Sequence, residues 1–283
     1  MTARAPHVPA LATVATIARR EARAALSGLG VYVATSIAMV AATWLLLIDV
    51  RALRVAGLLV PADPYRAPLD VALLVLAFFF AVSAAVSTAR DRETGTLEVL
   101  FFGPVDEITY CLGKVCGLLA VYALMMPVLA LSLAALSLMS GLALPGSLGA
   151  SLVFSLIPAA MVLSLGLVLS IGTRRVRSAV LILGGVALIL VGGSAAYSIV
   201  LLVPIENPSS PVVALRDVLA AVNGVLRWVS PFAYLQRIVA EGVAIGAWRS
   251  AAIAAGFALA ASGAMIVLAA QWLRWRGVQK AGE

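Results

Sequence analysis

Charged residues are scarce in this sequence of 283 residues: they make up 12% of the chain, whereas 63% of the residues are hydrophobic. Soluble globular proteins carry about 25% charged residues. The shortage of charge, together with a mean hydropathy of +1.08, excludes an ordinary soluble domain. It indicates an integral membrane protein.

Histidine and cysteine are also nearly absent. The only histidine, His7, lies in the N-terminal tail, and the only cysteines are Cys111 and Cys116. Five residues along a helix turn these two thiols about 140° apart, whereas a zinc site usually needs three or four converging ligands. The sequence therefore argues against a metalloprotease and against a Ser/His protease. We expect no catalytic residue, no metal and no cofactor on this chain, which is then not an enzyme.

The sequence lacks a phosphate-binding G-x-x-x-x-G-K-[ST] loop, because Gly113-Lys114 stands without the preceding glycine-rich segment. If ATP powers this protein, ATP and magnesium are bound by a partner. The hydrophobic runs also contain no Asp, Glu, His or Lys, the groups that proton- and sodium-driven carriers place inside the membrane. This absence argues against an ion-coupled carrier but leaves a passive channel or a lipid scramblase open.

What the chain does contain is a series of long apolar runs. Each is close to or longer than the roughly 20 residues that a helix needs to cross a bilayer, and lipid permits only helices or closed barrels. We predict an all-α integral membrane protein, a single domain over 1–283, with six spanning helices at about 29–48, 71–89, 115–140, 148–172, 178–203 and 250–272.

The distribution of Lys and Arg predicts the orientation. If the N-terminus is cytoplasmic, 13 of the 20 basic residues lie on the cytoplasmic side, with the sharpest cluster at Arg174-Arg175-Val176-Arg177. This bias predicts a multi-pass protein of the cell membrane with both termini in the cytoplasm. Because the basic residues gather at the ends of spans and not along one face, the net charge of +7 indicates no nucleic-acid partner.

Two segments outside the spans have helical periodicity. Residues 9–27 carry apolar positions at helical spacing with Arg19, Arg20 and Arg23 elsewhere around the wheel, which favours an interfacial helix over a frayed basic tail. Residues 204–249 form a predicted external segment. After an irregular start, it contains an amphipathic helix that lies on the outer leaflet or caps an exit path; the apolar positions are Leu215, Val218, Leu219, Val222, Val225, Leu226 and Val229.

Small residues in the fifth span predict a close helix contact. Gly185 and Gly192 are two turns apart, and Gly192 and Ala196 form a small-xxx-small pair. The partner helix lies either in the same chain or in a second subunit.

A charged insert, Asp91–Pro104, separates the second and third spans within a predicted cytoplasmic segment, 90–114. Gly95 should end the helix that leaves the second span, Thr94 or Thr96 can cap a new short helix, and Gly103-Pro104 should end it. Leu97, Leu100 and Phe101 then share one side, and Glu93 and Glu98 stay available to cations. This pattern suits docking to a cytoplasmic partner; an ordinary solvated loop is the alternative.

The insert also carries a family resemblance. Its Glu93-Thr94-Gly95-Thr96-Leu97-Glu98 sequence, followed by Pro104-Val105 and Gly113-Lys114, resembles the E-x-G-T-L-E…P-V…G-K signature of ABC-2 type ABC transporter permeases. The start at Ile17–Glu21 is similar to that of these permeases. The Ser230-Pro231-Phe232 motif resembles the branch of gliding-motility and nitrous-oxide-reductase-maturation systems.

This resemblance implies a type V exporter-like architecture with two six-span permeases, identical or different, each engaging a separate ABC ATPase that binds ATP and magnesium. It implies an ATPase-coupling interface at Glu93, Gly95, Thr96, Leu97 and Glu98, and Leu100 and Phe101 join it through the spacing above. The leading hypothesis is the permease subunit of an ABC exporter. The alternatives are a mechanical transmitter that acts on an external partner protein without cargo, and an ATP-independent channel or scramblase.

Overall fold

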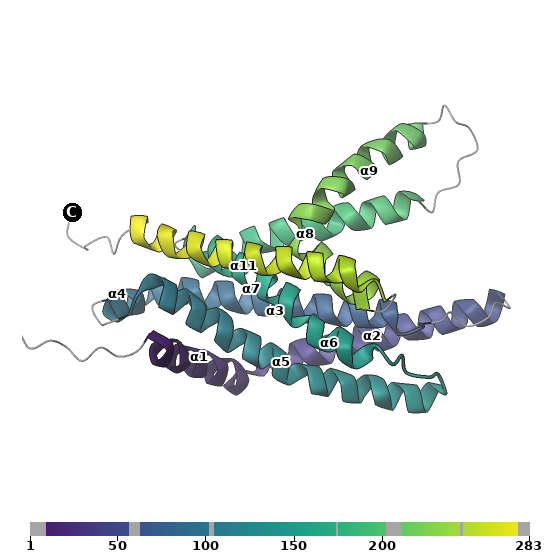
Figure 1. Cartoon of the computed structure of the whole chain (residues 1–283), viewed down its shortest axis with the longest axis horizontal. Helices are drawn as coiled ribbons and strands as arrows, with labels where there is room; N and C mark the ends of the chain where they lie inside the picture. Colours follow the sequence, from purple (N-terminus) through teal and green to yellow (C-terminus); the bar gives the residue numbers. More distant parts are fainter. Residues whose placement is uncertain are drawn as a thin grey trace, which may run out of the picture.

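The computed structural model is an elongated bundle of helices (Figure 1), and it describes residues 10–56, 63–101, 105–173, 175–201, 211–243 and 246–276. Within these ranges every regular element is helical. In chain order they are α1 (Ala10–Ser27), α2 (Leu29–Ala56), α3 (Arg66–Glu93), α4 (Thr96–Phe101), α5 (Glu107–Ser140), α6 (Leu148–Phe154), α7 (Leu156–Ile171), α8 (Val176–Leu201), α9 (Pro211–Val229), α10 (Pro231–Leu235), the π-helix η1 (Gln236–Val243) and α11 (Trp248–Arg276).

Among the described residues, six stretches of helix are long and apolar enough to cross a membrane. They coincide with the six predicted runs and confirm the all-α membrane fold. The fourth is built from α6 and α7, which meet at Ser155. Pro158 lacks the N–H that would bond back to the carbonyl of Phe154, and this loss explains the break. The six stretches are Leu29–Arg51, Arg66–Glu93, Glu107–Ser140, Leu148–Ile171, Val176–Leu201 and Trp248–Trp275.

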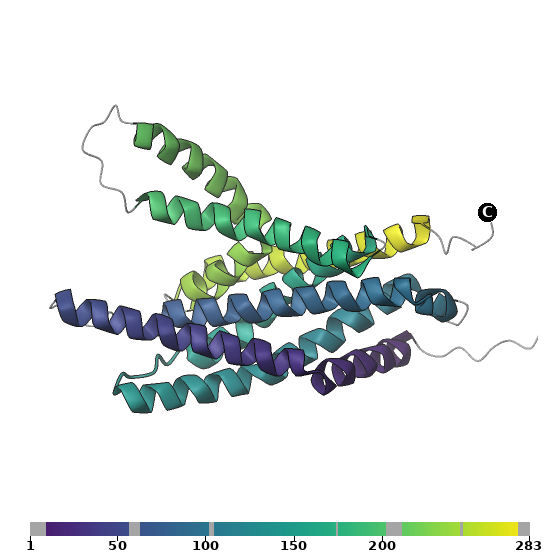
Figure 2. The ribbon, with the colours of Figure 1, turned by 180° about the vertical axis from the view of Figure 1, so that it is seen from behind.

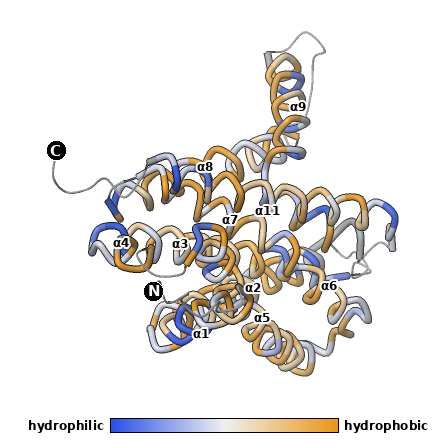
Figure 3. Tube along the Cα trace, turned by 60° about the vertical axis from the view of Figure 1, so that its left-hand side comes forward, coloured by the Kyte–Doolittle hydropathy of each residue, from blue (hydrophilic) through white to orange (hydrophobic). Residues whose placement is uncertain are grey.

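Apolar residues run along most of the bundle (Figure 3), and many of their side chains lie on its outside. Leu131 is 73% exposed, Leu138 87% and Leu188 73%. So large an apolar surface is a liability in water, whereas lipid tails solvate it without penalty. The outer surface of the bundle therefore suits the bilayer.

The interior is organised around α3, whose Phe80 is fully buried. Where α7 crosses it, Gly166 lies so close to the backbone of Ala81 that a Cβ would not fit. Next to this crossing, the hydroxyl of Ser170 donates a hydrogen bond of 2.6 Å to the carbonyl of Ala85. Small residues thus allow the two backbones to touch, as in other membrane helix pairs.

Helices extend into the predicted cytoplasmic segment, 90–114, from both of its ends. Helix α3 continues to Glu93 and α5 already begins at Glu107, so much of the predicted 90–114 connection is helical. The extension is stable because the charged residues it carries are paired with other helices, as described below. The basic N-terminal segment is also helical, as α1, so a frayed tail is wrong.

The predicted external segment, 204–249, contains the expected amphipathic helix, α9, which diverges from α8 in a V (Figure 2). The remainder packs against the bundle. The chain turns at Ser230-Pro231 and returns through α10 and η1, where Phe232 and Leu235 are 4% exposed and Ile238 is fully buried. This re-entrant portion is part of the bundle because its apolar side chains pack against α7 and α11.

Candidate functional site

The charged insert lies at one end of the bundle, where α1 and α5 begin and α11 ends (Figure 1); we call this the α4 end. Helix α3 stops at Glu93, and Gly95 adopts a φ of 68°. This left-handed conformation favours glycine because it lacks a Cβ. The chain therefore turns sharply, and α4 starts in a new direction at Thr96, whose hydroxyl lies 2.7 Å from that of Thr94.

Helix α4 turns its predicted apolar side toward the bundle itself. Leu97 is only 6% exposed and belongs to the hydrophobic core, and Leu100 and Phe101 pack against that core. The Phe101 ring stands edge-on to Tyr110, 6.0 Å between centroids. These side chains hold α4 in place, so in this conformation Leu97 is not a contact surface for a partner.

The exposed apolar residue of α4 is Val99, with 73% of its surface accessible. It lies about 200° around the helix from Leu97, on the side away from the bundle. The apolar spacing in the sequence singled out the anchoring side and missed this residue. Glu98 belongs to α4, but its side chain lies outside the described residues.

Three consecutive charged residues tie the end of α3 to other helices. The Arg92 guanidinium donates to the carbonyls of Ile171 and Thr173, at the end of α7, and the latter bond is 3.1 Å. Glu93 accepts a 2.8 Å hydrogen bond from the backbone N–H of Val176, the first residue of α8. A carboxylate is stabilised there by the helix dipole. Glu93 is thus exposed but already bound within the chain.

The third of these residues, Asp91, belongs to a buried ion cluster. The Lys114 ammonium, which is fully buried, lies 2.8 Å from Asp91 Oδ2, 3.2 Å from Glu21 Oε1 and 2.9 Å from the hydroxyl of Ser87. The Tyr110 hydroxyl donates to the same Asp91 oxygen at 2.7 Å. The cluster therefore joins α1, α3 and α5.

Arg20 closes the cluster at its solvent edge, 3.1 Å from Glu21 Oε1 and 3.7 Å from Asp91 Oδ2. Burial alone would lower the pKa of Arg20, but the hydrogen bond to Glu21 and the charges of Glu21 and Asp91 outweigh it, so the pKa is raised. Arg20 therefore remains charged, and the two carboxylates face two cations.

Close backbone contact reinforces this union of α1 and α5. A Cβ on Gly113 would lie 2.7 Å from Ile17, and one on Gly117 would lie 2.6 Å from the carbonyl oxygen of Ala18. Both distances are too short for a side chain. Glycine at these two positions, one turn apart, thus allows α1 to lie directly on α5.

Gly185 of α8 makes no close helix contact among the described residues. It is exposed and has open space where a Cβ would be. Gly192 and Ala196 are half-buried, and Gly192 meets only Leu188 of its own helix. The close approach lies at Gly193, where a Cβ would come within 2.6 Å of Leu226 on α9. Helix α9 was not foreseen as the partner.

The cysteines of α5 are not bonded to each other: Cys111 is buried and Cys116 is exposed.

Comparison with family models identifies the family. Residues 63–272 match the family model described as ABC-2 family transporter protein, which covers well over half of the chain. No curated protein matches the sequence.

Proposed function

The chain belongs to the ABC-2 family of transporter proteins and is a membrane permease subunit of an ABC transporter, and we propose that it is an exporter subunit driven by a separate ATPase that docks on α4. The ATPase binds ATP and magnesium. A second permease, identical or different, completes the transport pathway. The gliding-motility and nitrous-oxide-reductase-maturation branch is part of this proposal, carried by Ser230-Pro231-Phe232.

One observation carries the proposal: α4 is fixed to the bundle on one side and presents Val99 on the other. A hydrophobic residue at the centre of a small exposed surface is typical of a docking site. Because Leu97 and Phe101 anchor the helix, a push on α4 is transmitted to α3 and α5. The buried ion cluster extends that connection to α1.

The orientation follows from the basic residues. The α4 end carries α1 and the end of α11 (Figure 1), and 13 of the 20 Lys and Arg residues fall on this side of the predicted topology. We place this end in the cytoplasm. ATP binding would then close the ATPase pair beneath the bundle, and the movement of α4 would open a path toward the opposite side for apolar or amphiphilic cargo.

The experiment is a pull-down of the ATPase subunit, taken as the product of the gene next to this one, with the full-length permease. Val99→Asp should abolish capture with little change in the midpoint of thermal unfolding, because Val99 is 73% exposed and lies on the side of α4 away from the bundle. Leu11→Asp, at an 83% exposed residue in the first turn of α1 and outside the six spans, is the control at the same end of the bundle and should retain capture. Undiminished capture by Val99→Asp would refute docking on α4.

The mechanical transmitter is the second candidate, and α9 favours it because this helix diverges from the bundle (Figure 2) and exposes Leu215, Val218 and Val225. Reconstituted vesicles distinguish the two functions. ATP-dependent movement of a lipid or peptide across the bilayer supports the exporter, whereas activation of an external protein without such movement supports the transmitter.

A further inference from the structure

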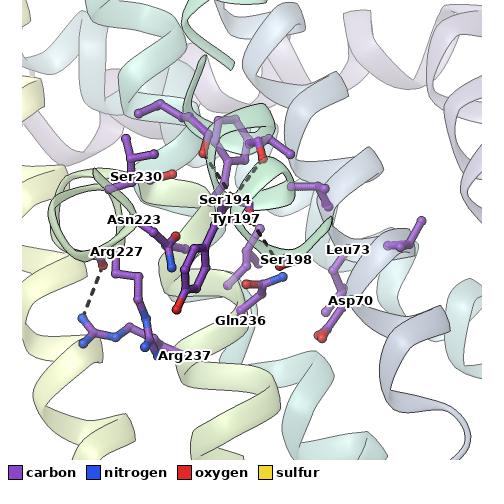
Figure 4. Close-up of a pocket in the computed structure, with 18 residues that line it drawn as sticks. Asp70, Leu73, Ser194, Tyr197, Ser198, Asn223, Arg227, Ser230, Gln236 and Arg237 are labelled. Carbon is purple, nitrogen blue, oxygen red and sulfur yellow. Dashed lines mark hydrogen bonds between the residues drawn. The ribbon is translucent and has the colours of Figure 1, made fainter. Parts of the chain in front are cut away.

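A cavity of about 300 Å³ (Figure 4) lies beside the start of α3, the end of that helix away from α4. Its walls come from the first turns of α3, the second half of α8, the end of α9, and α10 with η1. Ligand pockets usually measure about 300–1,000 Å³, so this cavity suits a small molecule or the headgroup of an amphiphile.

Opposite charges stand on two sides of the cavity. Asp70 lies on the α3 side, whereas Arg227 and Arg237 lie together on the other (Figure 4). Neutral hydrogen-bonding side chains, among them Asn223 and Gln236, lie between them. The cavity is therefore dipolar, with a negative and a positive side.

Within the described ranges the Asp70 carboxylate makes no hydrogen bond or ion pair. Arg66, about one turn earlier on α3 and outside the cavity lining, acts on it only through its charge. Arg237 is held in place by its guanidinium, which lies 4.4 Å from the ring centroid of Trp228 and donates a 3.4 Å hydrogen bond to the Arg227 carbonyl. A guanidinium has five N–H donors, so several remain for a ligand. An unpaired carboxylate beside a cavity is costly unless a cation fills the space.

A ligand with one charge fits this arrangement poorly. An anion would be repelled by Asp70, and a simple cation by the arginines. A ligand that carries both charges satisfies both sides, with each contact a charge-assisted hydrogen bond. Apolar residues complete the wall and suit an attached hydrocarbon; they include Leu73, Leu190, Leu226 and Phe232.

We propose that this cavity binds a zwitterionic phosphate–ammonium group, with the ammonium beside Asp70 and the phosphate beside Arg237 and Arg227. The group belongs either to a lipid headgroup or to a soluble zwitterion. The proposal goes beyond the transport function above, because binding at this site requires neither an ATPase nor ATP.

The test is a calorimetric titration of the purified full-length chain, in maltoside micelles, with each of three probes. The probes are a short-chain phosphatidylethanolamine, free phosphoethanolamine and a short-chain phosphatidylglycerol, which lacks the ammonium. We expect at least one of the two zwitterions to bind about tenfold or more tightly than the phosphatidylglycerol, because one charge-assisted hydrogen bond is worth about 1.5–3 kcal/mol.

Two variants assign the charges. Asp70→Asn should weaken binding of the zwitterion about tenfold or more and leave phosphatidylglycerol unaffected or tighter, which also shows that the cavity is still folded. Arg237→Gln should weaken both. Asp217→Asn, at an exposed acidic residue of α9 outside the cavity, is the matched control and should change neither.

The outcomes show whether the bound group belongs to a lipid or to a soluble zwitterion. Binding of the lipid alone identifies a headgroup, and binding of phosphoethanolamine identifies a soluble zwitterion. The proposal would be overturned if neither zwitterion bound more tightly than phosphatidylglycerol, or if the tighter zwitterion kept its full affinity in Asp70→Asn. Because no ATPase is present, these results leave the docking of the ATPase on α4 untouched.

Discussion

Removing the buried ammonium of Lys114 should destabilise the protein more than any change at an exposed charge. In Lys114→Met the carboxylates of Glu21 and Asp91 remain, with only 8% and 17% of their side chains exposed. Breaking a buried ion pair on one side costs about 3–5 kcal/mol. Arg20 stays within 3.7 Å of both and offsets part of this, so we expect about 3 kcal/mol.

The assay is thermal unfolding of the purified permease in one detergent, monitored by intrinsic fluorescence. For a chain of this size, 1 kcal/mol shifts the midpoint by about 2–4 °C, so Lys114→Met should lower it by about 6–12 °C. Arg19→Met is the control, because Arg19 is exposed on the same helix, α1, and its loss should shift the midpoint by about 2 °C at most.

A triple variant tests the cause. Lys114→Met combined with Glu21→Gln and Asp91→Asn removes both carboxylates that lose the ammonium while keeping the shapes, and should recover much of the lost stability. Arg20 then loses both of its partners, but its side chain is 45% exposed, so water can solvate its charge. A Lys114→Met midpoint equal to that of the wild type would refute the reasoning, and so would a triple variant that is no more stable than the single one.

Further predictions concern packing at the same end of the bundle. Gly117→Val should destabilise by about 1–3 kcal/mol, because its Cβ would meet the Ala18 carbonyl, whereas Gly149→Val, which faces open space, should have little effect on the unfolding midpoint. Leu97→Ala should cost about 2–5 kcal/mol and Val99→Ala under about 0.5 kcal/mol; equal losses in thermal unfolding would contradict the assignment of the two sides of α4. Glu93→Gln should lower the free energy of unfolding by about 0.3–1 kcal/mol, because the carboxylate no longer stabilises the N-terminus of α8. Thermal unfolding in high salt should show a smaller difference from the wild type.

Most of the helical architecture could be predicted because a run of about 20 apolar residues in lipid must hydrogen-bond its own backbone, which it does as a spanning helix. The turn at Gly95 could be predicted for a similar reason, since a glycine followed by a threonine is a local signal that needs no other part of the chain. The amphipathic spacing of α9 is local too. Its re-entrant continuation is not, because the apolar residues of α10 and η1 do not say which helices will bury them.

The candidate site shows the same division. Leu97, Leu100 and Phe101 share a side of α4 by spacing alone, but spacing does not say whether that side meets the permease or its partner. Lys114 and Glu21 are far apart along the chain, and nothing in either segment points to the other. Asp70 precedes the predicted second span, 71–89, and only the structure shows that it lies in the first turns of α3 and lines a cavity.

What the sequence alone determined is what depends on neighbours along the chain: the six apolar runs, the helical segment before them, the short charged helix between the second and third, and the lack of an ATP-binding loop. The tertiary structure decided which faces meet. It turned Leu97 inward and Val99 outward, brought α1 onto α5 through Gly113 and Gly117, and gathered distant charges around Lys114. The physical reason is that burial and ion pairing are properties of contacts between segments, and a linear pattern does not specify its partner.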